Sequence, residues 1–464
     1  MIIDKLKNIE LHKKYAFWAV IFGIAFSLLI PLRTVPDEPL HIAQAYSISN
    51  QLMGTKVNIN GSVAERSDDF TNYEYTDHYS WDLYVKYWKS LLSPIENETM
   101  VPTGQKEIST RYPYVLAALG ITIGRLFHAG TGITLNLGRL FNLLFFAACG
   151  ALALKLIPFG RELLFVILLL PMTIQQGMSF SYDVMVMALS FLITALFIRD
   201  NMSENLTKKQ IVKSVVIQFI LAALIFPIKS HAYVLFFLLP VYTLIHHFLN
   251  AETKRKILIA VRIFLLLAVV AGIIFWIFTA LHPSFIPEKT SYVAWAKEDG
   301  YTLSYVLHHQ LKIMYAMFLT LNYKFDYYFV TTVIGTALGP LTLPLPNSLN
   351  YVFLILLVLA SLHNRDQEIK LSRNIKILFF WIFIVTVLAI FLGMIIAWTP
   401  ISSNYVLGIQ GRYFLPVLFM AWILLDSPKV TISERLKEKV VPATIIMDII
   451  TVLFILGYGY IYRI

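Results

Sequence analysis

The sequence predicts an all-α polytopic membrane protein. Of its 464 residues, 58% are hydrophobic, and the mean hydropathy is +0.68. Both values are far too high for a soluble domain of ordinary composition. Runs such as 15–32, 261–281 and 377–398 reach the roughly 20 apolar residues that a crossing of the hydrocarbon core needs. Because lipid offers the backbone no hydrogen bonds, these runs are expected to be helices.

Eleven such spans are predicted within a single membrane domain that covers residues 1–464. Basic residues precede the first span without a cleavage pattern, so we interpret it as an uncleaved span with its N-terminus in the cytoplasm; they are Lys5, Lys7, Lys13 and Lys14. The predicted spans are 15–32, 134–155, 162–178, 184–199, 210–227, 231–249, 257–281, 347–363, 376–398, 413–427 and 440–461.

The apolar stretch 113–128 decides the orientation of every later loop, because counting it as a span would invert them all. If it only enters the interface, all later clusters of Lys and Arg become cytoplasmic, as the positive-inside tendency favours. These clusters lie at 155–161, 199–213, 254–256, 365–376 and 429–439. We therefore predict that 113–128 does not cross the membrane.

Two large external segments follow from this topology. The first, 33–130, contains the amphipathic stretch 81–92, which suits either a helix in the membrane interface or a small packed helix. The second, 282–346, carries an apolar helical stripe through Leu303, Leu311 and Phe318, and its part 333–346 is too rich in Gly and Pro for a simple span. This last part is expected to be re-entrant.

Charge and motifs exclude several function classes. The net charge of +10 arises from short clusters between apolar runs, so topology explains it better than a nucleic-acid partner does. Cys149 is the only cysteine, which leaves no disulfide framework and no cysteine-based metal site. P-loop, GxSxG and HExxH patterns are absent from the sequence.

Ionisable residues gather at the external ends of the predicted spans, and this convergence is the main functional signal. A charge at a membrane boundary is costly unless it is paired or faces a wet cavity. The residues are Asp37, Glu38, His41, Arg111, Arg139, Asp183, Lys229, His231 and Arg412.

The adjacent acids Asp37 and Glu38 lie between two prolines. They suit the N-terminus of a short helix that begins at Pro39, or a general base on a rigid backbone. Glu38 precedes Pro39 and is expected to be extended, so the shorter Asp37 is the favoured base. Asp183 suits a helix cap, or it shares a divalent cation, Mg²⁺ or Mn²⁺, with Asp37. No other cofactor is predicted.

Three cations are candidates for binding an anion. Lys229 either binds an anion or only extends its ammonium toward the membrane interface. Arg412 follows Gly411, which allows a close approach to the backbone. A guanidinium fork suits a phosphate group. Arg139 lies about one turn inside its span and is expected to face the protein interior.

Five motifs occur in the order seen in a family of uncharacterised bacterial polytopic membrane proteins, which the whole chain resembles. They are "VPDEPLHIAQAYSIS", "RYPYVLAALG", "PMTIQQGMSFSYD", "IGTALGPLTLPLP" and "QGRYFLP". That family is similar to the GT-C glycosyltransferases, which take a sugar from a polyprenyl phosphate outside the cytoplasm and carry an acidic motif after the first span.

The resemblance implies a GT-C-like fold in the cytoplasmic membrane, with an active site on the extracytoplasmic face. Asp37 or Glu38 would be the catalytic acid, and Arg412, Lys229 and Arg139 would bind the donor phosphate. The expected partners are a polyprenyl-phosphate-linked sugar, a cell-envelope glycan acceptor and the lipid bilayer. The remaining candidates for substrate binding are His41, Arg111, Tyr413, Gln176 and His231.

Two other classes remain open at this point. A transporter or flippase of lipid-linked sugars would also need a polar cavity and cations, but it would not need an acid placed as a base. In a non-catalytic assembly protein, Asp37 would only cap a helix.

Overall fold

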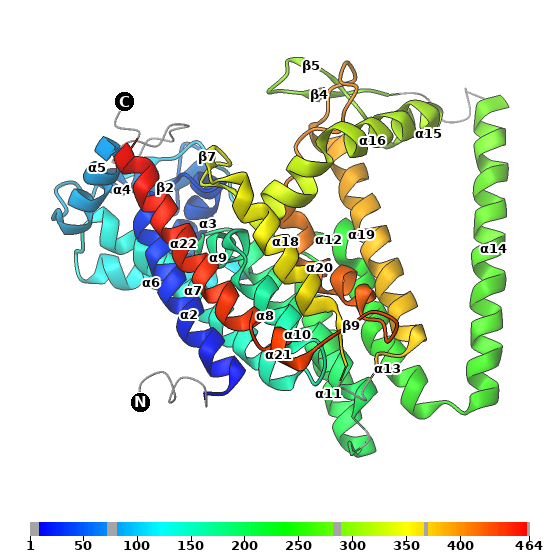
Figure 1. Ribbon diagram of the computed structural model, residues 1–464. Coiled ribbons are helices and arrows are strands. Elements are labelled where there is room, and N and C mark those ends of the chain that lie inside the picture. The colour runs from blue at the N-terminus through cyan, green and yellow to red at the C-terminus, as the bar shows by residue number, and fades with distance from the viewer. Residues whose placement is uncertain (1–8, 72–80, 204, 282–288, 366–369, 462–464) are drawn as a thin grey trace.

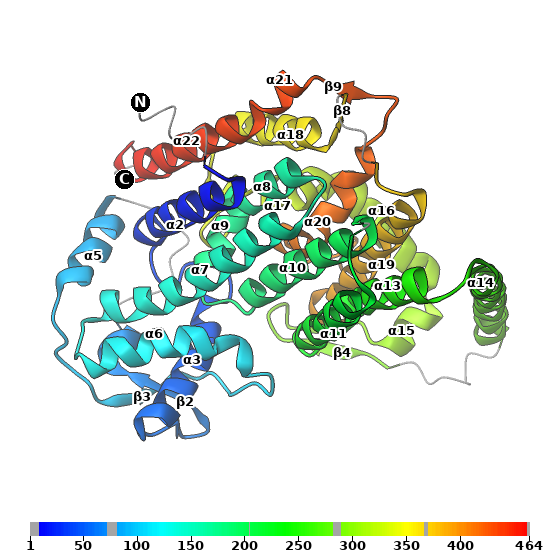
Figure 2. The ribbon, with the colours of Figure 1, turned by 90° about the horizontal axis from the view of Figure 1, so that it is seen from below.

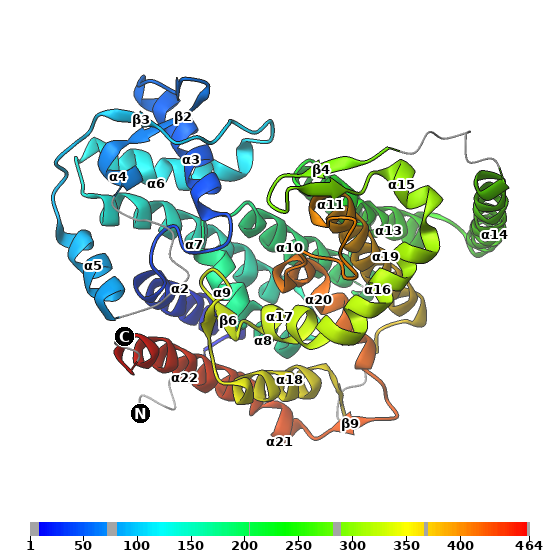
Figure 3. The same cartoon turned by 90° about the horizontal axis from the view of Figure 1, so that it is seen from above.

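Helices form most of the molecule, as the apolar runs predict (Figure 1). The structure, a computed structural model, describes residues 9–71, 81–203, 205–281, 289–365 and 370–461, so Lys5 and Lys7 lie outside it. α14 stands apart from the other helices in all three views (Figures 1, 2 and 3). Eight helices correspond most directly to predicted spans: α2 (Leu11–Leu29), α7 (Thr131–Leu156), α10 (Asp183–Met202), α11 (Lys208–Ile225), α14 (Ala251–Leu281), α18 (Asn347–Ser361), α19 (Arg373–Trp398) and α22 (Val440–Ile461).

Fewer helices than predicted have the length and composition of a complete span. Within the described residues, three qualify: Thr131–Leu156, Arg373–Trp398 and Glu434–Tyr458. A fourth is added if the bent pair Pro171–Met178 and Asp183–Met202 counts as one span. Several other predicted spans correspond to shorter apolar helices, so the count of eleven stays a prediction.

The predicted span 162–178 is not one continuous helix, which corrects the sequence-based expectation. It is divided into α8 (Arg161–Leu169) and α9 (Pro171–Met178), because Pro171 cannot continue the hydrogen bonding of α8 and instead begins α9. α9 then meets α10 at an angle of 119°. This sharp bend places the C-terminal end of α9 and the N-terminal end of α10 together at one end of the bundle.

Two other predicted spans are also interrupted. The region 231–249 contains α12 (Ser230–Tyr233), the 3₁₀ helix η2 (Val234–Phe237) and α13 (Leu238–Phe248). The region 413–427 contains the 3₁₀ helix η5 (Gly411–Phe414), α20 (Leu415–Trp422) and the 3₁₀ helix η6 (Ile423–Leu425). Near the opposite end, β8 (His363–Asn364) pairs with β9 (Thr431–Ile432), and α21 (Glu434–Lys437) precedes α22.

The first external segment folds into a small layer against α7 (Figures 2 and 3). Its antiparallel sheet has the order β1-β2-β3, with Ala64 opposite Pro102. α6 has 12 residues and a length of roughly 18 Å, which is too short to cross the hydrocarbon core. The elements are α3 (Glu38–Met53), β1 (Asn58–Ile59), β2 (Ser62–Arg66), α4 (Ser67–Thr71), α5 (Trp81–Leu92), β3 (Met100–Pro102), the 3₁₀ helix η1 (Tyr112–Tyr114) and α6 (Val115–Leu126).

The aromatic face of α5 packs against the protein, as the packed-helix interpretation of 81–92 requires. The Tyr87 hydroxyl donates to the carbonyl of Ser27 (2.5 Å), and the Trp88 indole donates to the carbonyl of Leu28 (2.7 Å). α5 is therefore a packed helix at the end of α2.

The second external segment combines a helix across the bundle ends with two hairpins (Figure 1). The stripe through Leu311 and Phe318 is exposed on α16, and the region 333–346 forms the β6–β7 hairpin, with Gly335 and Gly339 at positive φ. The elements are β4 (Ser291–Val293), β5 (Glu298–Gly300), α15 (Leu303–His308), α16 (Gln310–Phe325), the π-helix η4 (Asp326–Thr331), α17 (Thr332–Ile334), β6 (Ala337–Leu338) and β7 (Leu343–Pro344).

The predicted orientation is tested at the turn between α10 and α11. In an Asn205→Cys variant on a Cys149→Ala background, we expect a membrane-impermeant maleimide to label the protein only after the cells are permeabilised, because the adjacent basic cluster favours the cytoplasm. Glu96→Cys, in the first external segment, should be labelled in intact cells. Labelling of Asn205→Cys from outside would invert the map.

Candidate functional site

The loop that carries Asp37 is held from two directions. In the core, Arg139 of α7 donates to the carbonyls of Ile30 (2.7 Å) and Pro31 (3.1 Å). Away from the core, Arg33 forms an ion pair with Glu65 of β2. The segment between α2 and α3 is thereby fixed to both the bundle and the sheet, which gives Asp37 a defined position.

Asp37 has a strained backbone and a side chain that does not cap the helix. Its φ is +63°, a left-handed conformation that few residues other than glycine adopt. Although it lies at the N-cap position of α3, its carboxylate makes no capping hydrogen bond and instead accepts from Nη2 of Arg412 (2.6 Å). The Asp37 side chain is 56% exposed. The geometry therefore argues against the capping interpretation and presents the carboxylate to solvent.

Arg412 is the hub of the site. It is 3% exposed, and its Nη1 donates to the carbonyl of Pro36 (3.2 Å). Its Nε lies 3.7 Å from Oδ2 of Asp183. The guanidinium thus stands between two carboxylates from distant parts of the chain.

Gly411 allows a close backbone approach, but the approaching group is α17. A Cβ at Gly411 would lie 2.3 Å from the carbonyl carbon of Thr332, and the Gly411 amide donates to the Thr332 hydroxyl (2.8 Å). This contact seats η5, and with it Arg412, against α17. The close backbone approach expected at Gly411 is therefore made by α17.

Lys229 extends the row of alternating charges. Its Nζ lies 2.6 Å from Oδ1 of Asp183, and it stands 4.2 Å from the ring centroid of Tyr413 and 5.1 Å from that of Tyr182. The order Asp37, Arg412, Asp183, Lys229 therefore alternates negative and positive groups. Ion pairing and cation–π contacts compensate the desolvation of these charges.

Glu38 points away from Asp37 into the core. Its carboxylate accepts two hydrogen bonds from Arg139, from Nε (2.9 Å) and Nη2 (2.7 Å), and both side chains are fully buried. Glu38 is also the first residue of α3, so the predicted extended backbone at Glu38 is wrong, as is the predicted helix start at Pro39. Proline fits the first turn of a helix, which explains why the helix can begin here.

His41 lies one turn into α3 and is buried beneath the charged row. Its Nδ1 is 2.9 Å from the Tyr114 hydroxyl, and its ring packs edge-on against Tyr182. Burial, and then the nearby Arg412 guanidinium, lower the pKa of His41 to about 4. The imidazole is therefore neutral at physiological pH and serves as a hydrogen-bonding group.

Of the other predicted site residues, Gln176 and Tyr413 lie near Arg412, whereas Arg111 has a different partner. Gln176 is buried in α9, with Oε1 3.5 Å from Nη1 of Arg412. The Tyr413 ring makes cation–π contacts with both cations, and its centroid lies 4.2 Å from Nζ of Lys229 and 5.3 Å from the guanidinium carbon of Arg412. Arg111 instead bonds to the Ser47 hydroxyl (2.9 Å). His231 belongs to α12, but its side chain lies outside the part of the chain that the structure describes.

A pocket of about 510 Å³ opens above Asp37. Its walls come from the α2–α3 loop, the first external segment, the β6–β7 hairpin and the residue before η5. The lining residues are Pro36, Asp37, Pro39, Leu40, Gln105, Pro340, Leu341 and Gln410. Its volume lies within the range typical of small-molecule sites.

The acids of the site do not fit a divalent cation in this arrangement. Asp37 and Asp183 both face Arg412, which occupies the place between them. Among the described residues, no group of three or more His, Cys, Asp or Glu side chains is positioned to hold a metal ion. A cation shared by the two acids would have to displace the Arg412 guanidinium.

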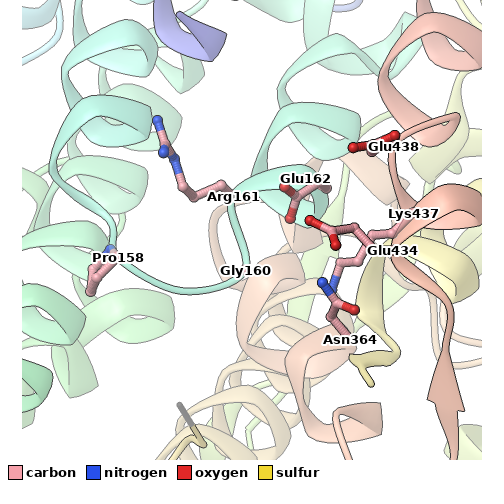
Figure 4. A pocket seen from close by; sticks show the side chains of 8 residues that line it. All are labelled: Pro158, Gly160, Arg161, Glu162, Asn364, Glu434, Lys437 and Glu438. Atoms are coloured by element: carbon pink, nitrogen blue, oxygen red, sulfur yellow. The ribbon is translucent and has the colours of Figure 1, made fainter. Parts of the chain in front are cut away.

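A second pocket, of about 160 Å³, lies toward the opposite end of the bundle, between the start of α8 and α21 (Figure 4). It mixes charges of both signs, and the Lys437 ammonium donates to the carbonyl of Leu362 (2.9 Å). None of the predicted site residues lines it. The lining residues are Pro158, Gly160, Arg161, Glu162, Asn364, Glu434, Lys437 and Glu438.

Sequence reasoning missed several residues of the site. Tyr182 and Tyr114 form the aromatic surroundings of Lys229 and His41, and Gln105 and Gln410 line the pocket. Tyr114, Tyr182 and Gln410 lie inside the sequence motifs, within three residues of a charged residue, but nothing in the sequence distinguishes them from their other uncharged neighbours. Gln105 lies outside every motif.

Comparison with known proteins places the chain in a family without assigning it a chemistry. No curated protein matches the chain, and no solved structure matches it. The family model described as "Predicted membrane protein (DUF2142)" matches residues 20–421, a stretch that runs from within α2 into α20 and includes Asp37, Asp183 and Arg412. The chain therefore belongs to the DUF2142 family of predicted membrane proteins.

Proposed function

We propose that this protein is a GT-C-type membrane glycosyltransferase that moves a sugar from a polyprenyl-phosphate donor to a cell-envelope glycan on the extracytoplasmic face. The observation that carries the proposal is Asp37. Its carboxylate is exposed in the lining of a pocket, sits on a strained backbone and is oriented by a buried arginine. Strained, polar and oriented residues in a concave site are typical of chemistry rather than of packing.

In the proposed reaction, an acceptor hydroxyl attacks the anomeric carbon of the donor sugar. The hydroxyl oxygen forms the new glycosidic bond, the bond from the anomeric carbon to the phosphate oxygen breaks, and polyprenyl phosphate leaves with its electron pair. Asp37 takes the hydroxyl proton as general base. The transition state has oxocarbenium character, as in glycoside hydrolysis.

The leaving phosphate needs positive charge, and Arg412 and Lys229 are the proposed source. Both cations are paired with carboxylates in this structure, so the phosphate would take over hydrogen bonds that Asp37 or Asp183 now accept. Such donors stabilise developing charge best when they are preorganised in a site that excludes water. The row of alternating charges supplies that preorganisation.

Glu38 and Arg139 fit a structural role better than the catalytic and phosphate-binding roles that the sequence suggested. Each satisfies the other in the core, and neither lines the pocket. Their contribution to the proposed reaction is to hold the loop that carries Asp37.

A turnover assay separates this proposal from its main alternative, a transporter or flippase of lipid-linked sugars. Purified protein is given defined polyprenyl-phosphate sugars, and the release of polyprenyl phosphate is measured. Transport and scaffolding leave the donor bond intact, so an uncleaved donor across a full panel of sugars and envelope acceptors would refute the enzyme proposal.

Arg412→Lys is expected to lower kcat/KM although it preserves the charge. The lysine would lose the fork that now reaches both Asp37 and the carbonyl of Pro36. A loss of about 1 to 3 kcal/mol in transition-state stabilisation, roughly 5- to 150-fold, is expected for a buried charged hydrogen bond. Lys312→Arg, in α16, is the control and should behave like the wild type. Unchanged kinetics in Arg412→Lys would remove Arg412 from the proposed phosphate site.

A further inference from the structure

The pocket above Asp37 has an unusual lining for a site next to two cations. Five of its eight residues are proline or leucine, two are glutamines and one is aspartate. None of these eight described residues carries a positive charge. The arginine and lysine of the site lie behind the pocket wall rather than in it.

The electrostatics of the pocket disfavour a charged ligand of either sign. Asp37 stands between the pocket and the buried Arg412, so a phosphate in the pocket would meet a carboxylate first. Two like charges at close range repel each other, and the repulsion is stronger near a protein surface than in bulk water. A cation would find the Asp37 carboxylate already paired with Arg412. A neutral ligand avoids both costs.

Two acceptor groups in the pocket lining can each take a hydrogen bond from a donor on the ligand. Oε1 of Gln410 is buried and has no hydrogen-bond partner among the described residues. The exposed Asp37 carboxylate also accepts only. A sugar ring carries several hydroxyl groups, so one can donate to each residue, whereas a phosphate dianion has no proton to donate. The Gln105 amide offers both a donor and an acceptor.

The side-chain amide of Gln175 holds the apolar wall of the pocket in place through the backbone of Gly339. Oε1 of Gln175 accepts from the Gly339 amide (2.7 Å), and its Nε2 donates to the Gly339 carbonyl (3.2 Å). Pro340 and Leu341 follow directly at the tip of the β6–β7 hairpin. A wall fixed in this way needs little ordering when a ligand binds, and its apolar surface suits the C–H face of a sugar ring.

We propose that this pocket binds a neutral, hydroxyl-bearing sugar ring through Asp37, Gln410 and Gln105. That this ring belongs to the acceptor rests on the proposed function, since only a glycosyl transfer makes its hydroxyl the nucleophile. Binding of the neutral ring itself does not depend on that function.

The proposal is tested by protection of a single cysteine at the pocket wall. Purified Cys149→Ala/Leu341→Cys protein is alkylated with a small water-soluble maleimide. The reaction contains methyl glycosides of glucose, galactose, mannose or N-acetylglucosamine, or inorganic phosphate at matched ionic strength, with sorbitol as the control for osmolality. We expect at least one glycoside to slow alkylation severalfold in a saturable manner, and phosphate to have no effect.

A second substitution links the protection to the pocket. When Gln410→Leu is added to this cysteine protein, the dissociation constant of the protecting glycoside should rise by roughly fivefold or more. The substitution removes an acceptor to which a sugar hydroxyl would donate. Gln51→Leu, on the exposed side of α3, is the matched control and should leave the constant unchanged. Equal constants in both variants would contradict the proposal.

The remaining outcomes separate this inference from the proposed function. Protection by phosphate, or protection by none of the glycosides, would overturn the neutral-sugar site even if the donor is cleaved. Protection by a glycoside without any donor cleavage would support the sugar site and refute the glycosyl transfer.

Discussion

Asp37→Asn is expected to lower turnover by about 10²- to 10⁴-fold while the protein stays folded. Asparagine has nearly the same shape, tolerates the left-handed backbone at φ +63°, and can still accept a hydrogen bond from Arg412 through Oδ1. It cannot take a proton from an acceptor hydroxyl. The expected defect is therefore chemical, with donor binding and thermal stability close to those of the wild type.

The measurement is polyprenyl-phosphate release at matched purity, with the thermal unfolding midpoint determined on the same preparation. Asp299→Asn, which changes an exposed acid of β5, is the control for a general effect of removing an external carboxylate. Near-normal turnover in Asp37→Asn would exclude Asp37 as the base. If the wild-type protein moves the lipid-linked sugar across the bilayer without cleaving it, this result would support the transporter alternative.

The sequence predicted the class of fold because membrane helices depend on local composition. Apolar runs and basic clusters located most of the long helices, including α7, α19 and α22. Local composition did not predict how helices break and bend. Pro171 divides a predicted span, and the bend between α9 and α10 depends on packing against other helices.

The sequence also does not predict the direction in which the side chains of the site point. Asp37 and Glu38 are adjacent and chemically alike, so the sequence treats them as interchangeable. One left-handed residue at the start of α3 sends their side chains to opposite sides, one to a pocket and one to the core. Their partners, Arg412 and Arg139, lie 375 and 101 residues away, and only the packed structure brings each pair together.

Breaking the Glu38–Arg139 pair from one side is expected to destabilise the folded protein by about 3 to 5 kcal/mol, because the remaining charge would be buried without a partner. Arg139→Leu should show the larger effect. It strands the Glu38 carboxylate and also removes the donors to the carbonyls of Ile30 and Pro31. Glu38→Gln should be milder, since the amide oxygen can still accept one hydrogen bond from Arg139.

The double variant Glu38→Leu/Arg139→Leu distinguishes an ion-pair effect from a general packing effect. Removing both charges should recover much of the stability lost in Arg139→Leu, although the two loop carbonyls stay without their donor. Thermal unfolding in detergent micelles measures all three variants, and Arg435→Leu, whose parent side chain is exposed, is the comparison for loss of an arginine outside the core. Wild-type stability in Arg139→Leu would show that the pair does not hold the loop. A Glu38→Gln protein that is fully stable yet loses turnover as severely as Asp37→Asn would instead return Glu38 to the chemistry, because an acid that only positions the loop must act through the stability or geometry of that loop.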